Sequence, residues 1–179
     1  MPPIGRAAAS ALILGLLGCS SPLPIQLFAS GGPAFDPVEF FRGSIRSWGV
    51  MENRSGEPTD IVLTEGHGEA EGSNGVHFPQ IVTIGRETPT KRDWHMRRVG
   101  PGRYEATAND MVGTAHGEAA GRGFHWSWTL APHPGNPLTN VGMDQWWYLQ
   151  DDRSMLNRTI ITKLGIVVAE VTEHFTRTP

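Results

Sequence analysis

The sequence predicts an all-β protein, an antiparallel up-and-down β-barrel of about eight to ten strands with a short N-terminal helix. Apolar and polar residues alternate with period two in many short runs, which is the pattern of strands with one buried face. Clusters of Gly, Pro and Asn separate these runs and suit tight hairpins, so neighbouring strands should pair as a meander. No long apolar stripe of helical period follows residue 43. A sheet of this size removes its exposed edges by closing into a barrel.

The first residues have the features of a bacterial export signal. Arg6 precedes an apolar stretch from Ala7 to Leu17, which is too short for a spanning helix of about 20 residues and matches the apolar region of a signal peptide. The residues Leu16-Leu17-Gly18-Cys19 resemble the bacterial lipobox, in which signal peptidase cleaves before the cysteine and the sulfur carries a diacylglycerol. We therefore expect residues 1–18 to be a lipoprotein signal peptide and Cys19 to be lipidated. The alternative is an ordinary secretory signal cleaved elsewhere.

Residues 19–34 are rich in Ser, Pro and Gly and are expected to form a tether. Acyl chains on Cys19 would hold the domain at a membrane surface, since each buried methylene contributes about 0.8 kcal/mol. Ser20 and Ser21 follow Cys19, without the Asp that retains such lipoproteins in the inner membrane. The expected location is therefore the outer membrane of a bacterial cell envelope, facing the periplasm, with the membrane as a partner through acylated Cys19.

Residues 35–179 are expected to form a single β-barrel domain. With 39% hydrophobic residues among 179, the chain can build one packed core but not two domains of typical size. Asp36 is the predicted helix N-cap, Pro37 takes the first helical position, and Gly43 ends the helix within about two turns. The longest predicted loop is 132–141. The predicted strands are 45–52, 60–71, 76–86, 91–99, 103–112, 113–120, 124–130, 144–150, 155–162 and 166–176.

The order of helix and first strand resembles that of the lipocalins and related calycin barrels. In those proteins a helical turn leads into a strand that carries a Gly and a Trp, and the Trp closes the bottom of the barrel. Here Gly43 and Trp48 take these places, but they are further apart than in the strict Gly-x-Trp spacing. The resemblance therefore implies a shared architecture and no shared ligand.

Composition and missing motifs exclude several functional classes. A net charge of −3 without a basic run argues against nucleic-acid binding. A single Cys excludes an intramolecular disulfide and a zinc site built from several thiolates. The chain contains no nucleophile elbow, no His-Glu-x-x-His and no phosphate-binding loop. Two His-Gly-Glu segments begin at His67 and His116. Their His and Glu side chains could converge on a metal ion, or they could lie on the solvent face of two strands. We favour the solvent face, predict no cofactor and no metal, and leave catalysis open.

Two groups of residues are candidates for binding a ligand inside the barrel. Trp126 and Trp128 alternate with polar residues between Phe124 and Leu130, so they share one strand face. They can line a cavity or fill the core, as can Trp48. The second group is polar and lies in strands that otherwise look buried. A carboxylate–guanidinium pair from this group would orient the polar end of a ligand, whereas the alternative is solvated or cross-strand charges. The group comprises Asp110, Asp144, Asn157, Arg158, Lys163 and Glu170.

Several short segments between about Phe35 and Phe175 together form a specific pattern. They are Phe41-Arg42-Gly43, Trp48-Gly49, the run from Arg103 to Ala115, Leu156-Asn157-Arg158, Lys163-Leu164-Gly165 and Glu170-Val171-Thr172. In this pattern the chain resembles the bacterial lipoprotein family called domain of unknown function 3833. It differs from the family at Phe78 to Thr83, where the family has acidic residues and an aromatic one. It also differs at Met143 to Tyr148, where the family has Asp-Asp-Trp before a Tyr and this chain keeps only Asp144 of the acidic pair. The resemblance implies a location and a fold but no reaction.

These observations favour a lipid-anchored envelope lipoprotein whose barrel binds or carries an apolar small molecule, such as a fatty acid, a lipid or a pigment. One alternative is an enzyme acting on a lipid or isoprenoid, with Asp110 or Glu170 as general acid or base. Another is a structural envelope protein that works through its outer face. The alternatives differ in whether the barrel is hollow and in which charged side chains face its interior.

Overall fold

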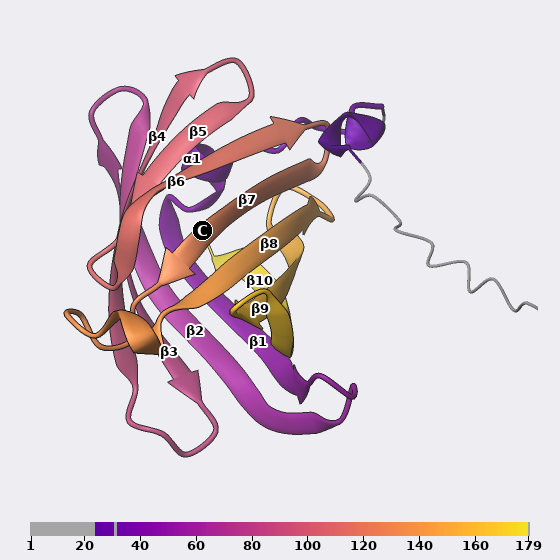
Figure 1. Cartoon of the computed structure of the whole chain (residues 1–179). Coiled ribbons are helices and arrows are strands. Elements are labelled where there is room, and N and C mark those ends of the chain that lie inside the picture. Colours follow the sequence, from indigo (N-terminus) through magenta and orange to yellow (C-terminus); the bar gives the residue numbers. More distant parts are fainter. Residues whose placement is uncertain (1–23, 31, 179) are drawn as a thin grey trace, which may run out of the picture.

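The computed structural model describes residues 24–30 and 32–178, which form a closed antiparallel barrel of ten strands (Figure 1). Around the barrel the order is β1-β10-β9-β8-β7-β6-β5-β4-β3-β2, so each strand pairs with its neighbours in the chain and β1 closes on β10. The predicted all-β meander barrel is confirmed. The strands are β1 (Gly43–Asn53), β2 (Pro58–Glu71), β3 (Gly75–Ile84), β4 (Thr90–Gly100), β5 (Arg103–Thr107), β6 (Met111–Ala120), β7 (Gly123–Leu130), β8 (Val141–Leu149), β9 (Ser154–Lys163) and β10 (Ile166–Thr178).

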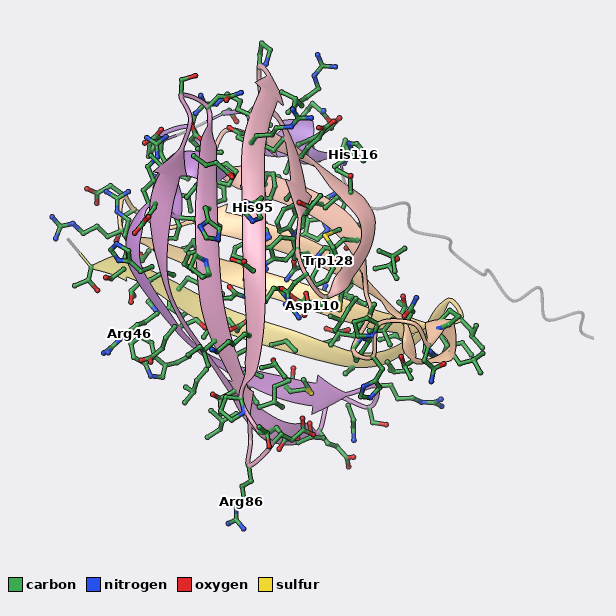
Figure 2. All side chains as sticks on the ribbon, turned by 90° about the vertical axis from the view of Figure 1, so that its left-hand side faces the viewer. Arg46, Arg86, His95, Asp110, His116 and Trp128 are labelled. Atoms are coloured by element: carbon green, nitrogen blue, oxygen red, sulfur yellow. The ribbon has the colours of Figure 1, made fainter. Side chains whose placement is uncertain are left out.

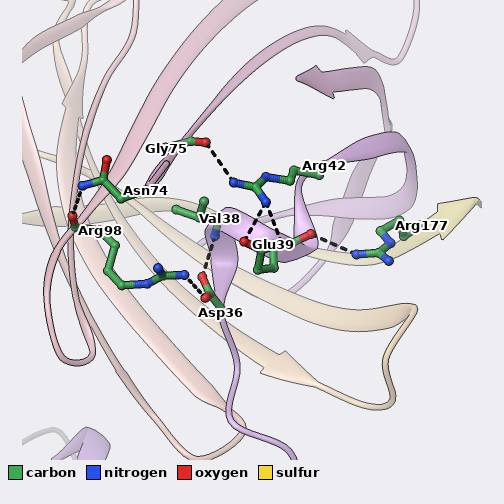
Figure 3. Close-up of polar contacts among 8 residues, drawn as sticks. All are labelled: Asp36, Val38, Glu39, Arg42, Asn74, Gly75, Arg98 and Arg177. Carbon is green, nitrogen blue, oxygen red and sulfur yellow. Dashed lines mark hydrogen bonds and ion pairs between the residues drawn. The ribbon is translucent and has the colours of Figure 1, made fainter. Parts of the chain in front are cut away.

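The predicted helix is a single turn, α1 (Pro37–Phe40), and it covers one end of the barrel. The Asp36 side chain accepts a hydrogen bond from the backbone nitrogen of Val38, as expected of an N-cap. Its other oxygen pairs with Arg98, next to the β4–β5 turn (Figure 3). The chain approaches β2 so closely that a Cβ on Gly68 would lie 1.9 Å from the Phe41 carbonyl oxygen. The helical turn is therefore held against the barrel wall by packing as well as by its cap.

Part of the segment expected to be a tether packs on the barrel. The 3₁₀ turn η1 (Ile25–Phe28) lies against β6 and β7, and the Ile25 side chain is buried. The Phe28 ring contacts Trp146 and Tyr148 on the outer face of β8, with ring centroids 6.1 Å and 5.5 Å apart. The predicted signal peptide and Cys19 lie outside the described residues. Among the helices of the described part, none combines the length and the apolar character that crossing a membrane requires.

One predicted strand boundary is wrong. Residues 103–112 do not form one strand, because β5 ends at Thr107 and β6 begins at Met111. The Asn109 side chain accepts a hydrogen bond from the backbone nitrogen of Asp93 at 2.7 Å. At that point of β4, this bond takes the place of a backbone hydrogen bond between strands. This side-chain bond turns the chain just before Asp110. The predicted 132–141 loop contains a short 3₁₀ turn, η2 (Pro137–Thr139).

The apolar core fills the α1 end of the barrel. Phe41 packs edge-on to Trp147 and against Phe78, with ring centroids 5.5 Å and 5.0 Å apart. Phe124 is 1% exposed, and its ring packs in edge-to-face arrangements against the rings of Phe35, Tyr104 and Trp126. These large rings lie near α1, and a cavity remains in the interior beyond them.

Candidate functional site

A cavity of about 130 Å³ lies inside the barrel between the aromatic core and the opposite rim. It extends from Phe41, beside α1, towards Leu130 and Ile161 near the ends of β7 and β9. Most of its wall is apolar, which favours an apolar ligand. The apolar lining comprises Phe41, Met51, Val62, Val76, Phe78, Val82, Ile84, Trp94, Met96, Trp126, Leu130, Met143, Trp147, Ile161, Val171 and Phe175.

Glu173 is the buried acidic side chain of the cavity wall. It lies on β10 between the inward-facing Val171 and Phe175 and is 8% exposed. Its Oε1 accepts hydrogen bonds from Ser47 Oγ at 2.6 Å and from Thr64 Oγ1 at 3.2 Å. Burial raises the pKa of Glu173 above its usual range, although these two hydroxyls and Arg92 act in the opposite direction. The protonated form is therefore favoured relative to a glutamate in water, and it can donate a hydrogen bond to a ligand.

The space for Glu173 is provided by a glycine. Gly49 lies directly opposite on β1, and a Cβ there would lie 2.4 Å from Glu173 Cγ. A glycine inside a strand often marks such a close approach. The two residues together place a carboxyl group inside the barrel at a point where any larger residue on β1 would expel it.

Arg92 is the cation of the cavity. Its Nε donates to both Asp110 oxygens, at 2.9 Å and 2.8 Å, and the two side chains are 14% and 18% exposed. The guanidinium carbon lies 4.9 Å from the ring centroid of Trp128 and 5.9 Å from that of Trp94. Cation–π contact and the ion pair together hold the guanidinium in place. The Asp110 bonds use only Nε, so the two terminal amino groups take no part in that pair.

A network of hydrogen-bonded polar side chains holds Trp126 and Trp128 in place. Gln145 Oε1 accepts from the indole nitrogens of Trp126 and Trp128, both at 2.8 Å. Gln145 Nε2 donates to Thr159 Oγ1 at 2.9 Å, and that hydroxyl donates to Asn157 Oδ1 at 2.8 Å. Buried polar groups need such partners, so this network sets the orientation of both indoles.

The indole nitrogen of Trp147 has no such partner. Within the described residues, it is a buried nitrogen of the cavity wall without a hydrogen bond. A buried donor left unpaired costs about 1–3 kcal/mol. An acceptor atom inside the cavity would remove that cost.

Four of the predicted binding residues lie inside the barrel. Trp126 lines the cavity and Trp128 stacks on Arg92, so the expected inward face of this strand is observed. Asn157 is 1% exposed and ends the Gln145 network, and Asp110 holds Arg92. Figure 2 shows Asp110 and Trp128 within the barrel outline, whereas Arg46 and Arg86 project away from it.

The other five predicted binding residues lie outside the cavity. Trp48 is 53% exposed, and Asp144 accepts from Ser127 and contacts His125 on the outer wall. Arg158 and Glu170 form a 2.5 Å ion pair on the outer face. Lys163 donates to backbone carbonyl oxygens of the η2 loop.

The misplaced glutamate has a local cause. A bulge between Val167 and Ala169 interrupts the alternation of β10, so Glu170 does not share a face with Ile166. Beyond the bulge, Val171, Glu173 and Phe175 take the inward face and Glu170 takes the outward one. The sequence does carry signals for the two residues that were missed. Glu173 alternates with Val171 and Phe175, and Arg92 alternates with Trp94 and Met96, so each shares a face with large apolar residues.

The two histidines of the repeated segments do not converge, because His67 contacts Ser44 whereas His116 lies near Glu105.

The closed barrel and its internal cavity give the protein a lipocalin-like, or calycin-like, fold. The fold is similar to that of the S-type phycobiliprotein lyase CPES from Guillardia theta, with a TM-score of 0.57, 10% identity, and 79% of this chain and 90% of that chain covered. The chain belongs to the family described as "Protein of unknown function (DUF3833)", whose model matches residues 13–177.

Two further solved structures share the fold. Rv2717c from M. tuberculosis has a TM-score of 0.56 and 14% identity, with 81% of this chain and 99% of that chain covered. A protein of unknown function of the DUF3598 family from Nostoc punctiforme has a TM-score of 0.57 and 12% identity, with 82% and 51% covered. No curated protein matches the sequence. These similarities establish the fold and assign no ligand.

Proposed function

We propose that the protein binds an apolar small molecule with an anionic or carbonyl end, such as a fatty acid, a lipid or a pigment. The observation that carries this proposal is a largely apolar cavity, closed near α1 by aromatic rings, with Arg92 in its wall. The terminal amino groups of Arg92 can bind a carboxylate, since a guanidinium matches carboxylate geometry. The apolar tail would then lie towards Phe78 and Trp147.

The size of the cavity limits how much of the ligand it holds. Its volume of about 130 Å³ is below the ~300–1,000 Å³ of sites that enclose drug-sized ligands. A long acyl chain would therefore extend past the rim or displace side chains. Met51 and Met143 line the cavity, and unbranched methionine side chains adapt readily to a new occupant.

Replacing the cation tests this assignment. We expect Arg92→Met, combined with Asp110→Asn to avoid an unpaired carboxylate, to weaken oleate binding at least tenfold, or about 1.4 kcal/mol. Binding is measured by quenching of tryptophan fluorescence, since Trp94, Trp126 and Trp147 line the cavity. Methyl oleate, which lacks the charge, should lose far less affinity.

Arg158→Met is the matched control, because Arg158 forms an ion pair on the outer face. It should leave oleate binding unchanged. Equal losses in the control and in the cavity variant, or no oleate binding by the unmodified protein, would contradict the proposal.

We also propose that the barrel is anchored to the outer membrane through a lipid on Cys19, facing the periplasm. The support is the lipobox-like run from Leu16 to Cys19 and the absence of Asp after it. Cys19→Ser should abolish incorporation of labelled palmitate in growing cells and release the protein from the membrane fraction. Palmitate labelling that persists in this variant would refute the anchor.

A catalytic role is the second candidate, and the raised pKa of Glu173 favours it. A protonated carboxyl in a cavity can act as general acid towards a bound lipid or isoprenoid. The role expected for Asp110 or Glu170 would then belong to Glu173, because each of the other two is paired with an arginine. Retention of full cellular function by Glu173→Gln would rule out this candidate.

A further inference from the structure

A cluster of histidine and carboxylate side chains lies on the outer wall of the barrel, away from the cavity. His77 on β3 is directly opposite His95 on β4, and Asp93 lies two residues before His95 on the same strand face. Figure 2 shows His95 on the wall that faces the viewer. Glu71 on β2 completes the group, which we call the outer histidine cluster: Glu71, His77, Asp93 and His95.

The ligand atoms of the cluster already converge. One nitrogen from each of His77 and His95 and one oxygen from Asp93 lie within 4.8 Å of one another. His77 Nε2 is 2.5 Å from Asp93 Oδ1, and His95 Nδ1 is 2.9 Å from Glu71 Oε1. The two imidazole rings stack, with centroids 4.5 Å apart and planes 11° apart. Each ring therefore already contacts a carboxylate, and these contacts hold the ligand atoms of the cluster close together.

The surroundings leave the cluster accessible to solvent, and Arg46 and Lys91 line the groove that also contains His77 and Asp93. Gly75 lies between Glu71 and Arg97 in the strand register and has no side chain, so Glu71 can reach across β3 to His95. Arg97, the next outward cation on β4, is engaged by Glu105 at 2.6 Å. The His77, Asp93 and His95 side chains are 35%, 49% and 46% exposed, so an ion can enter from solvent.

We propose that His77, Asp93 and His95 bind a divalent transition-metal ion, with Zn²⁺ or Cu²⁺ as the best match and Glu71 as a fourth ligand or as the orienting partner of His95. Imidazole nitrogens with carboxylate oxygens suit these ions. Two carboxylates and two neutral imidazoles balance the charge of the ion. Two ligand atoms of a tetrahedral zinc site lie about 3.3 Å apart, and an imidazole nitrogen binds an ion in the plane of its ring. Closing the site therefore requires one of the two stacked imidazoles to turn so that both nitrogens point at the ion.

Metal titration of protein without a histidine tag tests the site. Calorimetry should show one Zn²⁺ per chain with a Kd on the order of micromolar. His77→Ala and His95→Ala should each weaken binding at least tenfold. Both positions lie on the outer wall, so the fold should persist, and circular dichroism checks this. His125→Ala is the matched control, since His125 also contacts an aspartate on the outer wall, Asp144, but stacks on Trp146 and not on a second histidine.

The electron paramagnetic resonance spectrum of bound Cu²⁺ provides an independent readout. The unmodified protein and His125→Ala should both show coupling to two imidazole nitrogens, and His95→Ala should show coupling to one. Absence of one-to-one binding, or equal affinity in the His77 and His95 variants and the unmodified protein, would overturn the proposal. Neither result would bear on ligand binding inside the barrel, because no residue of the cluster lines the cavity.

Discussion

Phe124→Ala is expected to lower the free energy of unfolding by about 3–5 kcal/mol, the usual cost of truncating a buried aromatic side chain. Phe124 is 1% exposed and contacts the rings of Phe35, Tyr104 and Trp126. It also covers Gly117 on β6, where a Cβ would lie 2.5 Å from the Phe124 ring. The hydrogen-bonded wall of a closed barrel cannot collapse into the space left behind, which places the expected loss towards the upper end of the range.

Urea denaturation monitored by tryptophan fluorescence measures this loss. Leu156→Ala is the control, because Leu156 is an apolar residue on the outer face that is 39% exposed. It should change the stability by no more than about 0.5 kcal/mol. Similar losses for the two variants would mean that the aromatic cluster near α1 is not the main core of the barrel.

Glu173→Gln is expected to change how stability depends on pH. Burial raises the pKa of Glu173 in the folded state, so the folded protein holds a proton that the unfolded chain has already released. The wild-type stability should therefore fall as the pH rises from the ordinary glutamate value of 4.5 through the raised pKa, and level off above it. Glutamine carries no charge and can still accept the Ser47 and Thr64 hydrogen bonds. The variant should lack this fall.

At pH values above the raised pKa, Glu173→Gln should be the more stable protein, by about 1–3 kcal/mol, which is the typical cost of burying an inadequately paired polar group. Unfolding free energies across the pH range test the prediction. Glu170→Gln is the control, because Glu170 pairs with Arg158 on the outer face. A Glu173→Gln protein less stable than wild type at high pH would show that the cavity stabilises the ionised carboxylate. A residue that reduces stability in this way is typical of a functional site.

Most of the strands could be predicted because their signals are local. Alternation places Trp126 and Trp128 on one face, and Gly-rich turns such as Gly100-Pro101-Gly102 mark the hairpins. The candidate site was harder to predict. Asp110 was a candidate, but its partner Arg92 lies 18 residues away on another strand. Alternation alone does not say which strands bring charged groups together.

The bulge in β10 shows most clearly where sequence reasoning fails. A shift of one residue in a strand exchanges its inner and outer faces, and the shift between Val167 and Ala169 places Glu170 on the opposite face from Ile166. The bulge lies in the pairing of β10 with β9, and the alternation of apolar and polar residues does not predict it. The outer histidine cluster likewise exists only because β2, β3 and β4 lie side by side in one register.

The amino-acid sequence alone was sufficient for the all-β meander, the N-cap at Asp36 and the family, because alternation, turn residues and motifs are properties of short segments. The register in which β1 pairs with β10, the volume of the cavity and the position of Glu173 opposite Gly49 were decided by the tertiary structure. The reason is physical: each depends on strand register and on close approaches such as Gly49 to Glu173, and these are set by contacts between residues far apart in the chain.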